Sequence, residues 1–81
     1  MSKWDSFIEP VQREIKKGTE ALEKNDSSMA ELFAQEAMHV RNRATKDVIE
    51  IKPGSDLWIE WHEAQGLIDG LKSAINKAKN N

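Results

Sequence analysis

His62 and Glu63 form the only pair of neighbouring residues that matches part of a known catalytic motif. In zinc enzymes with the motif His-Glu-x-x-His, two histidines four residues apart lie on one face of a helix and bind the metal. The position of the second histidine is occupied here by Gly66. His39 belongs to a different predicted helix, about 9 Å along the axis from His62 when the two helices are paired. We therefore expect no metal site and no metal cofactor.

Few other residues could support catalysis. The chain has 81 residues, with no cysteine, no tyrosine and two histidines. It offers no thiol nucleophile, no nucleophile–base pair and no glycine-rich phosphate loop. We predict that the protein is not an enzyme and that it binds no cofactor.

A basic group on the second predicted helix, Arg41, Arg43 and Lys46, could contact an anion such as phosphate. Arg41 and Arg43 lie about 200° apart around a helix, so they do not form one patch. Glu60 and Glu63 fall near the same level on the third predicted helix, which favours ion pairs between helices as the alternative. Twelve basic and fourteen acidic residues give a net charge of -2, which does not favour a nucleic-acid partner.

Three stretches of the chain repeat apolar or small residues at the spacing of an α-helix. We predict helices near residues 7–24, 28–51 and 56–78, separated by turn-forming residues at 25–28 and 52–56. The predicted stripes are Trp4, Ile8, Val11, Ile15, Gly18 and Leu22; Met29, Phe33, Ala37, Val40, Ala44, Val48 and Ile51; and Leu57, Trp61, Ala64, Ile68, Leu71, Ile75 and Ala78. The predicted helix starts carry the capping sequences Ser6-x-x-Glu9 and Ser28-x-x-Glu31, and Ser55 or Asp56 before the third helix.

A connection of about four residues between the second and third helices makes them antiparallel. We predict an all-α fold, with a long antiparallel helical hairpin of these two helices and an N-terminal helix packed on it as in a three-helix bundle. The chain forms a single helical domain, residues 1–81, with a frayed tail at 77–81. Three apolar stripes exceed what one hairpin buries, so we expect the protein to be oligomeric.

Gly66, Gly70 and Ser73 form a groove of small residues along the third predicted helix. Two glycines together cost a helix about 2 kcal/mol relative to alanine, so a closely packed neighbour is expected. Two neighbours fit this description. One is the first helix, approaching near Gly18, and the other is a helix of a second subunit or of a protein partner.

Trp58 and His62 lie one helical turn apart beside this groove. Trp58 is either a lid over the open end of the hairpin or an anchor in a protein–protein interface, where tryptophan is enriched. We take Gly66, Gly70, Ser73, Trp58 and His62 as the candidate interface with another subunit or a protein partner.

The chain contains no apolar run near the ~20 residues that a membrane span requires. Residues Met1–Asp5 lack the apolar core of a signal peptide. From these features we expect a cytoplasmic protein that does not associate with membranes.

The segment from Trp58 to Lys72, WIEWHEAQGLIDGLK, resembles the closing helix of small helical accessory and assembly proteins of tailed bacteriophages. The resemblance covers this helix and carries no functional residues. It implies a phage accessory or assembly protein, virion-bound or host-directed. Together with the oligomer expected from the apolar stripes, this favours a homo-oligomeric phage structural, assembly or accessory component, located in the host cytoplasm or in the virion. The alternative is a small phage-encoded inhibitor or adaptor that binds a host macromolecule or a small anionic signal.

Overall fold

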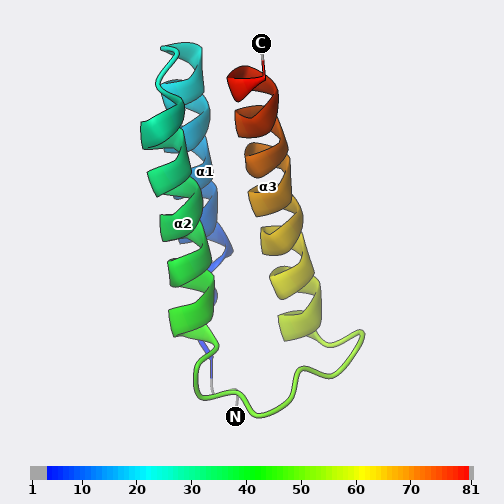
Figure 1. Cartoon of the computed structure of the whole chain (residues 1–81). Helices are drawn as coiled ribbons and strands as arrows, with labels where there is room; N and C mark the ends of the chain where they lie inside the picture. The colour runs from blue at the N-terminus through cyan, green and yellow to red at the C-terminus, as the bar shows by residue number, and fades with distance from the viewer. Residues whose placement is uncertain (1–3, 81) are drawn as a thin grey trace.

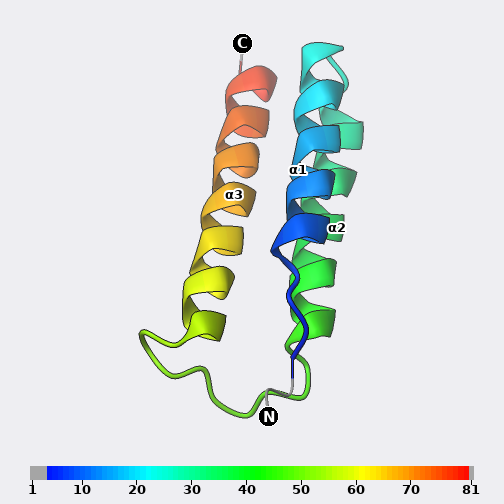
Figure 2. The ribbon, with the colours of Figure 1, turned by 180° about the vertical axis from the view of Figure 1, so that it is seen from behind.

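The computed structural model describes residues 4–80 and contains three helices: α1 (Ile8–Glu23), α2 (Ser27–Ala44) and α3 (Asp56–Lys79). Figure 1 shows that the chain ascends through α1, descends through α2 and ascends again through α3. Viewed from behind in Figure 2, α1 lies in front of α2, and α3 stands beside both. The bundle measures 46 × 18 × 16 Å. Among the described residues there is no strand, and the prediction of an all-α fold with three helices is confirmed.

The described part of the chain stops short of both ends of the sequence. Residues 1–3 and Asn81, on which the predictions about a signal peptide and a frayed tail partly rest, lie outside the described residues. Within the segment predicted to fray, α3 continues to Lys79, and Asn80 is its C-cap. Lys79 forms an ion pair with Glu31 of α2, which ties this last turn to the bundle.

α1 begins without the predicted capping box. Its N-cap is Phe7, which has no capping side chain, and Ser6 does not cap Glu9. Instead, Glu60 of α3 accepts a hydrogen bond from the Phe7 N–H at 2.8 Å and another from the Ser6 hydroxyl at 2.9 Å. A carboxylate at a helix N-terminus is favoured by the helix dipole, so α3 supplies the cap that the local sequence does not. Pro10 lies in the first turn, as predicted.

α1 and α2 are joined by a tight reversal at residues 24–26. Asn25 has φ 61°, in the left-handed region, where asparagine is tolerated better than most residues. Its N–H donates to the Leu22 carbonyl, and the Asp26 N–H donates to the Ala21 carbonyl, both at 2.9 Å, which defines a Schellman motif. Asp26 then caps α2 by accepting from the Met29 N–H at 3.1 Å. The predicted cap at Ser28 is therefore wrong by two residues.

α2 ends at Ala44, and the prediction that it extends to Ile51 is wrong. The following residues include four β-branched side chains, which have low helix propensity, at Thr45, Val48, Ile49 and Ile51. Residues 45–55 instead form a connection that contains turns at 45–47 and 53–54 and is longer than the four residues expected (Figure 1). Val48 and Ile51 still pack against the core from this connection, while Ile49 is 97% exposed.

The buried residues form two clusters along the bundle axis. One cluster, nearer the chain start, comprises Phe7, Val11, Ala37, Leu57, Ala64 and Ile68. The other, nearer the α1–α2 reversal, comprises Ala21, Ala30, Ala34, Leu71 and Ile75. All five buried residues of α3 belong to its predicted stripe, whereas two other members of that stripe are not buried: Trp61 is half-buried and Ala78 is exposed.

α2 buries a different line of residues from the predicted stripe. Its buried positions are Ala30, Ala34, Ala37 and Arg41, and of these only Ala37 belongs to the prediction. Small alanine side chains allow the backbones of neighbouring helices to approach closely. Met29, at the start of the predicted stripe, is 44% exposed.

Candidate functional site

α3 has an outward face that no other described element covers. Its inner stripe is buried, and the opposite side carries the exposed residues Ile59, His62, Gly66, Gly70 and Ser73. We call these five residues the outer face of α3. Ile59 is 53% exposed, which leaves a large aliphatic side chain in contact with solvent.

Both glycines of this face are open. A Cβ atom added at Gly66 or at Gly70 meets no heavy atom within 4 Å. The interpretation that α1 packs into the groove is therefore wrong for this chain. Gly18 is indeed a point of close approach, because a Cβ there would lie 2.6 Å from Leu71 Cδ2 and 3.4 Å from Phe33 Cβ. The helix contact expected at Gly18 exists, but it involves the inner side of α3.

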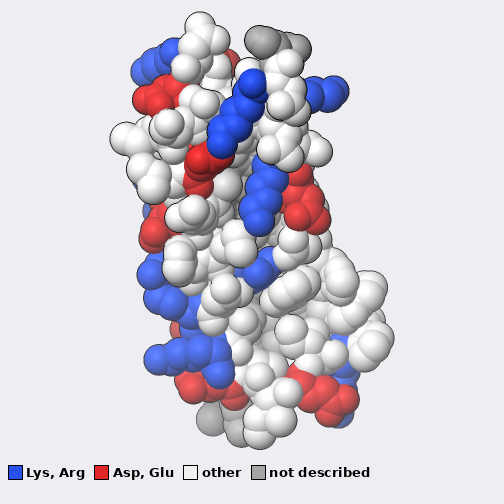
Figure 3. All heavy atoms as spheres, in the orientation of Figure 1, with Lys and Arg blue, Asp and Glu red and all other residues white. Residues whose placement is uncertain are grey.

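Trp58, Trp61 and His62 form an aromatic cluster in the first half of α3. The His62 ring lies 4.3 Å from the Trp58 ring and 5.5 Å from the Trp61 ring, measured between centroids. Trp58 and Trp61 are half-buried, and His62 is exposed. Figure 3 shows an uncharged area over this half of α3. The cluster borders the outer face of α3, as the sequence predicts from the spacing of Trp58 and His62.

Arg41 is buried between α2 and α3 and has partners on both helices. It is 6% exposed, and its guanidinium carbon lies 4.3 Å from the Trp61 ring centroid. It donates hydrogen bonds to the side chains of Gln65 and Asn42. Burial lowers the pKa of the Arg41 guanidinium, and the negative charge of Asp69 opposes this shift. Arg41 therefore joins the two helices and is committed to contacts within the chain.

The other two predicted anion contacts lie elsewhere. Arg43 is exposed and forms an ion pair with Glu36 at 3.4 Å, and Lys46 is exposed on the connection after α2. The fold does not bring these two side chains together with Arg41. Glu60, expected to pair with this basic group, instead caps α1.

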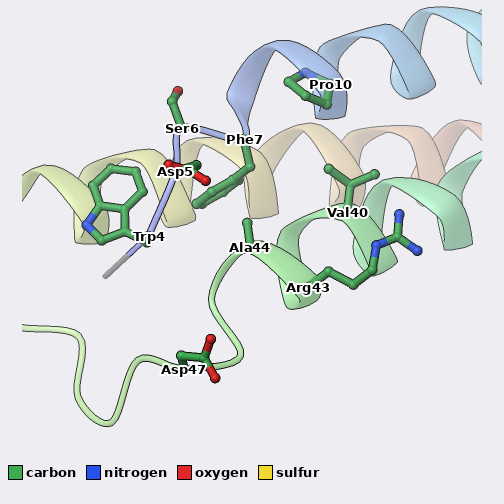
Figure 4. A pocket seen from close by; sticks show the side chains of 9 residues that line it. All are labelled: Trp4, Asp5, Ser6, Phe7, Pro10, Val40, Arg43, Ala44 and Asp47. Atoms are coloured by element: carbon green, nitrogen blue, oxygen red, sulfur yellow. The ribbon is translucent and has the colours of Figure 1, made fainter. Parts of the chain in front are cut away.

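A shallow cleft of about 580 Å³ lies between the segment before α1 and the end of α2 (Figure 4). Phe7 and Ala44 form its floor, Trp4 and Arg43 lie at opposite ends, and Asp47 reaches it from the connection. Sequence reasoning missed this cleft because it depends on the path of residues 45–55, which were predicted to be largely helical. Its mixed charges do not define one ligand chemistry.

Within residues 4–80, no group of three or more His, Cys, Asp and Glu residues is arranged to hold a metal ion. Nor does this part of the chain contain a helix with the length and apolar character that crossing a membrane requires. Comparison with protein-family models, with curated proteins and with solved structures gives no match. The functional argument therefore rests on the outer face of α3 and its surroundings.

Proposed function

We propose that this chain is a non-enzymatic helical interaction protein that assembles with copies of itself through the outer face of α3. The observation that carries the proposal is the exposure of Ile59 beside two glycines at which an added Cβ atom would meet no heavy atom within 4 Å. A helix face exposed to water in a monomer is normally lined by polar and charged side chains.

α1 provides an example of a solvent-exposed helix face in the same molecule, with which α3 can be compared. Its exposed side carries charges at helical spacing, at Glu9, Arg13, Lys16, Glu20 and Glu23. The outward positions of α3 at the same spacing are Ile59, Glu63, Gly66, Gly70 and Ser73, with a single charged residue among them. This difference supports a role for α3 in contacts between molecules and for α1 as a surface that faces solvent.

The small size of the core gives a thermodynamic reason for assembly. The largest fully buried side chains are Phe7, Ile68 and Val11, and α2 contributes three alanines to the interior. For a chain of this length, apolar burial and conformational entropy nearly cancel, so burial against a second copy adds stability. In this proposal α2 and α3 act as an antiparallel hairpin that holds the outer face straight.

The resemblance of α3 to phage accessory and assembly proteins suggests the biological context of the proposed assembly. We place the protein among homo-oligomeric components of a phage particle or of its assembly, acting in the host cytoplasm or in the virion. The alternative remains a small adaptor or inhibitor that uses Trp58 and His62 to bind a host macromolecule.

The test compares two exposed aliphatic residues on different helices. Ile59 on α3 is 53% exposed, and Leu32 on α2 is 59% exposed. We expect Ile59→Lys to shift the sedimentation of the protein towards the monomer, because it places a charge in the proposed interface. Leu32→Lys, the matched control, should leave the assembly unchanged.

Circular dichroism should show that both variants keep their helix content. Equal sedimentation of the Ile59→Lys and Leu32→Lys proteins would contradict the proposal. A parent protein that stays monomeric while Ile59→Lys abolishes capture of a host protein would favour the adaptor alternative.

A further inference from the structure

We propose that two copies pair through α3 in antiparallel directions, about a two-fold axis between Gly66 and Gly70. This inference rests on the proposed self-assembly and specifies its geometry. The starting observation is a second heptad stripe on α3, formed on its solvent side by Ile59, Glu63, Gly66, Gly70, Ser73 and Lys77. Their steps of 4, 3, 4, 3 and 4 residues are those of a helix-pairing seam.

All six residues of this outward stripe are exposed, and the buried stripe of α3 lies on the other side of the helix. One helix therefore carries two seams: the inner one binds α1 and α2, and the outer one is uncovered. A two-fold pairing requires a surface that is complementary to itself, so that each contact occurs twice. The outer stripe meets this requirement only in one relative direction of the helices.

Charge decides the direction. Glu63 lies in the first half of the stripe and Lys77 at its end. Parallel pairing would set Glu63 against Glu63 and Lys77 against Lys77 of the second copy. Antiparallel pairing brings Glu63 within about 6 Å, along the axis, of Lys77 of the second copy, which a lysine side chain can span. It also opposes the two helix dipoles.

Shape agrees with the same arrangement. In the antiparallel pair, Gly66 faces Gly70 of the second copy and Ile59 faces the aliphatic part of Lys77 of the second copy. Because a Cβ at either glycine would have open space around it, the two backbones can approach at this level without displacing any side chain of the protomer. His62 then falls level with Ala74 of the second copy, at the edge of the contact.

Asp69 flanks the centre of this pairing and could repel its counterpart. Its carboxylate accepts a hydrogen bond from Gln65 Nε2 at 2.8 Å and interacts electrostatically with buried Arg41. Both partners lie on the side of α3 that faces α2. The negative charge of Asp69 is thus partly compensated within its own protomer.

The absence of cysteine from the chain allows a direct test by disulfide formation. Ile59→Cys and Lys77→Cys proteins, distinguished by a mass tag, are mixed and oxidised with glutathione at neutral pH. We expect a disulfide between the two variants, because antiparallel pairing brings the two Cα atoms into the 4.4–6.8 Å range that the bond requires. Leu32→Cys on α2 is the control for random collision.

A disulfide between two Ile59→Cys chains would overturn the inference, since antiparallel pairing separates these positions by about 27 Å along the axis. The inference would also be overturned by a low yield of the disulfide between Ile59→Cys and Lys77→Cys. This yield would have to be no higher than that of Leu32→Cys, while sedimentation still shows a dimer. In both cases the proposed self-assembly would survive with a different geometry. A parent chain that is monomeric throughout would instead contradict the proposed function itself.

Charge reversal gives an independent readout. Each single variant, Glu63→Lys or Lys77→Glu, should raise the dissociation constant of the dimer by about two- to thirtyfold, as expected for two exposed ion pairs. The double variant Glu63→Lys/Lys77→Glu should return the dissociation constant to near the parent value. A double variant whose dissociation constant is raised by the product of the two single-variant factors would contradict antiparallel pairing.

Discussion

At the residue scale, the helical glycines of this protein differ sharply in their surroundings. Gly18 is buried against Leu71 and Phe33, whereas Gly66 and Gly70 face open space. A glycine in a helix interior costs roughly 0.5–1 kcal/mol relative to alanine. The protomer compensates this cost at Gly18 by close packing, and on our account the second copy compensates it at the other two positions.

Leucine substitutions separate these roles. We expect Gly18→Leu to lower the free energy of unfolding by about 1–3 kcal/mol, because its Cβ would already lie 2.6 Å from Leu71 Cδ2. Gly66→Leu should keep or raise the free energy of unfolding of the monomer by up to about 1 kcal/mol and should weaken the dimer. Urea unfolding at low protein concentration, with sedimentation at high concentration, measures both effects. A Gly66→Leu protein that dimerises as well as the parent would contradict this account.

Glu60 provides a second prediction at this scale. Its carboxylate accepts hydrogen bonds from the Phe7 N–H and the Ser6 hydroxyl, so Glu60→Ala leaves the start of α1 without its cap. We expect a loss of about 0.5–2 kcal/mol in the free energy of unfolding, the usual cost of removing a helix cap. Glu63→Ala, three residues later and exposed, should change stability by less than about 0.5 kcal/mol. Equal effects of the two variants in thermal and urea unfolding would show that Glu60 is not a cap.

At the element scale, the reversal between α1 and α2 depends on one backbone conformation. Asn25 has φ 61°, and residues with a Cβ pay about 1–2 kcal/mol there unless a short polar side chain helps. We expect Asn25→Ala to destabilise the protein by about 1 kcal/mol and Asn25→Gly to preserve or slightly increase its stability. Lys24→Ala, at a neighbouring residue with φ -93°, is the control. Identical melting temperatures for the alanine and glycine variants of Asn25 would contradict this assignment.

The helices also show which sequence patterns are informative. The inner stripe of α3 was predictable because large apolar residues repeat along it, such as Leu57, Ile68 and Leu71. The segment after Ala44 was not, because Val48 and Ile51 keep helical spacing while packing against the core from the connection. The spacing of apolar residues indicates which side chains are buried. Burial alone does not distinguish a helix from a connection that lies on the core.

The inner face of α2 escaped prediction for a different reason. Alanine contributes little to an apolar pattern, and an arginine in a sequence is expected at the surface of the protein. Arg41 is buried because Trp61 and Gln65 of α3 contact it, and no local pattern in α2 contains that information. The same applies to the Glu60 cap, which joins residues more than fifty positions apart.

At the scale of the whole molecule, the candidate face was largely predictable and its environment was not. The spacing of Trp58 and His62 and of Gly66, Gly70 and Ser73 indicates a shared side of one helix. Whether α1 covers that side depends on how the three helices pack. In the structure, both glycines are uncovered. The cleft beside Trp4 likewise arises from tertiary packing alone.

The elongated shape of the bundle gives the proposed interface its extent. The molecule is 46 Å long and no more than 18 Å wide, and α3 comprises 24 residues of it. The outer stripe runs from Ile59 to Lys77, about 27 Å at the rise of an α-helix. Pairing along this length would double the thickness of a narrow molecule and cover the exposed side of α3.

The most direct test of self-assembly is sedimentation equilibrium of the unaltered protein from low micromolar to millimolar concentration. The account predicts a reversible rise in average mass from the 9.2 kDa of one chain towards twice that value. The rise should be absent from the Ile59→Lys protein and retained by the Leu32→Lys protein. An average mass that stays at 9.2 kDa over the whole range would contradict the central claim.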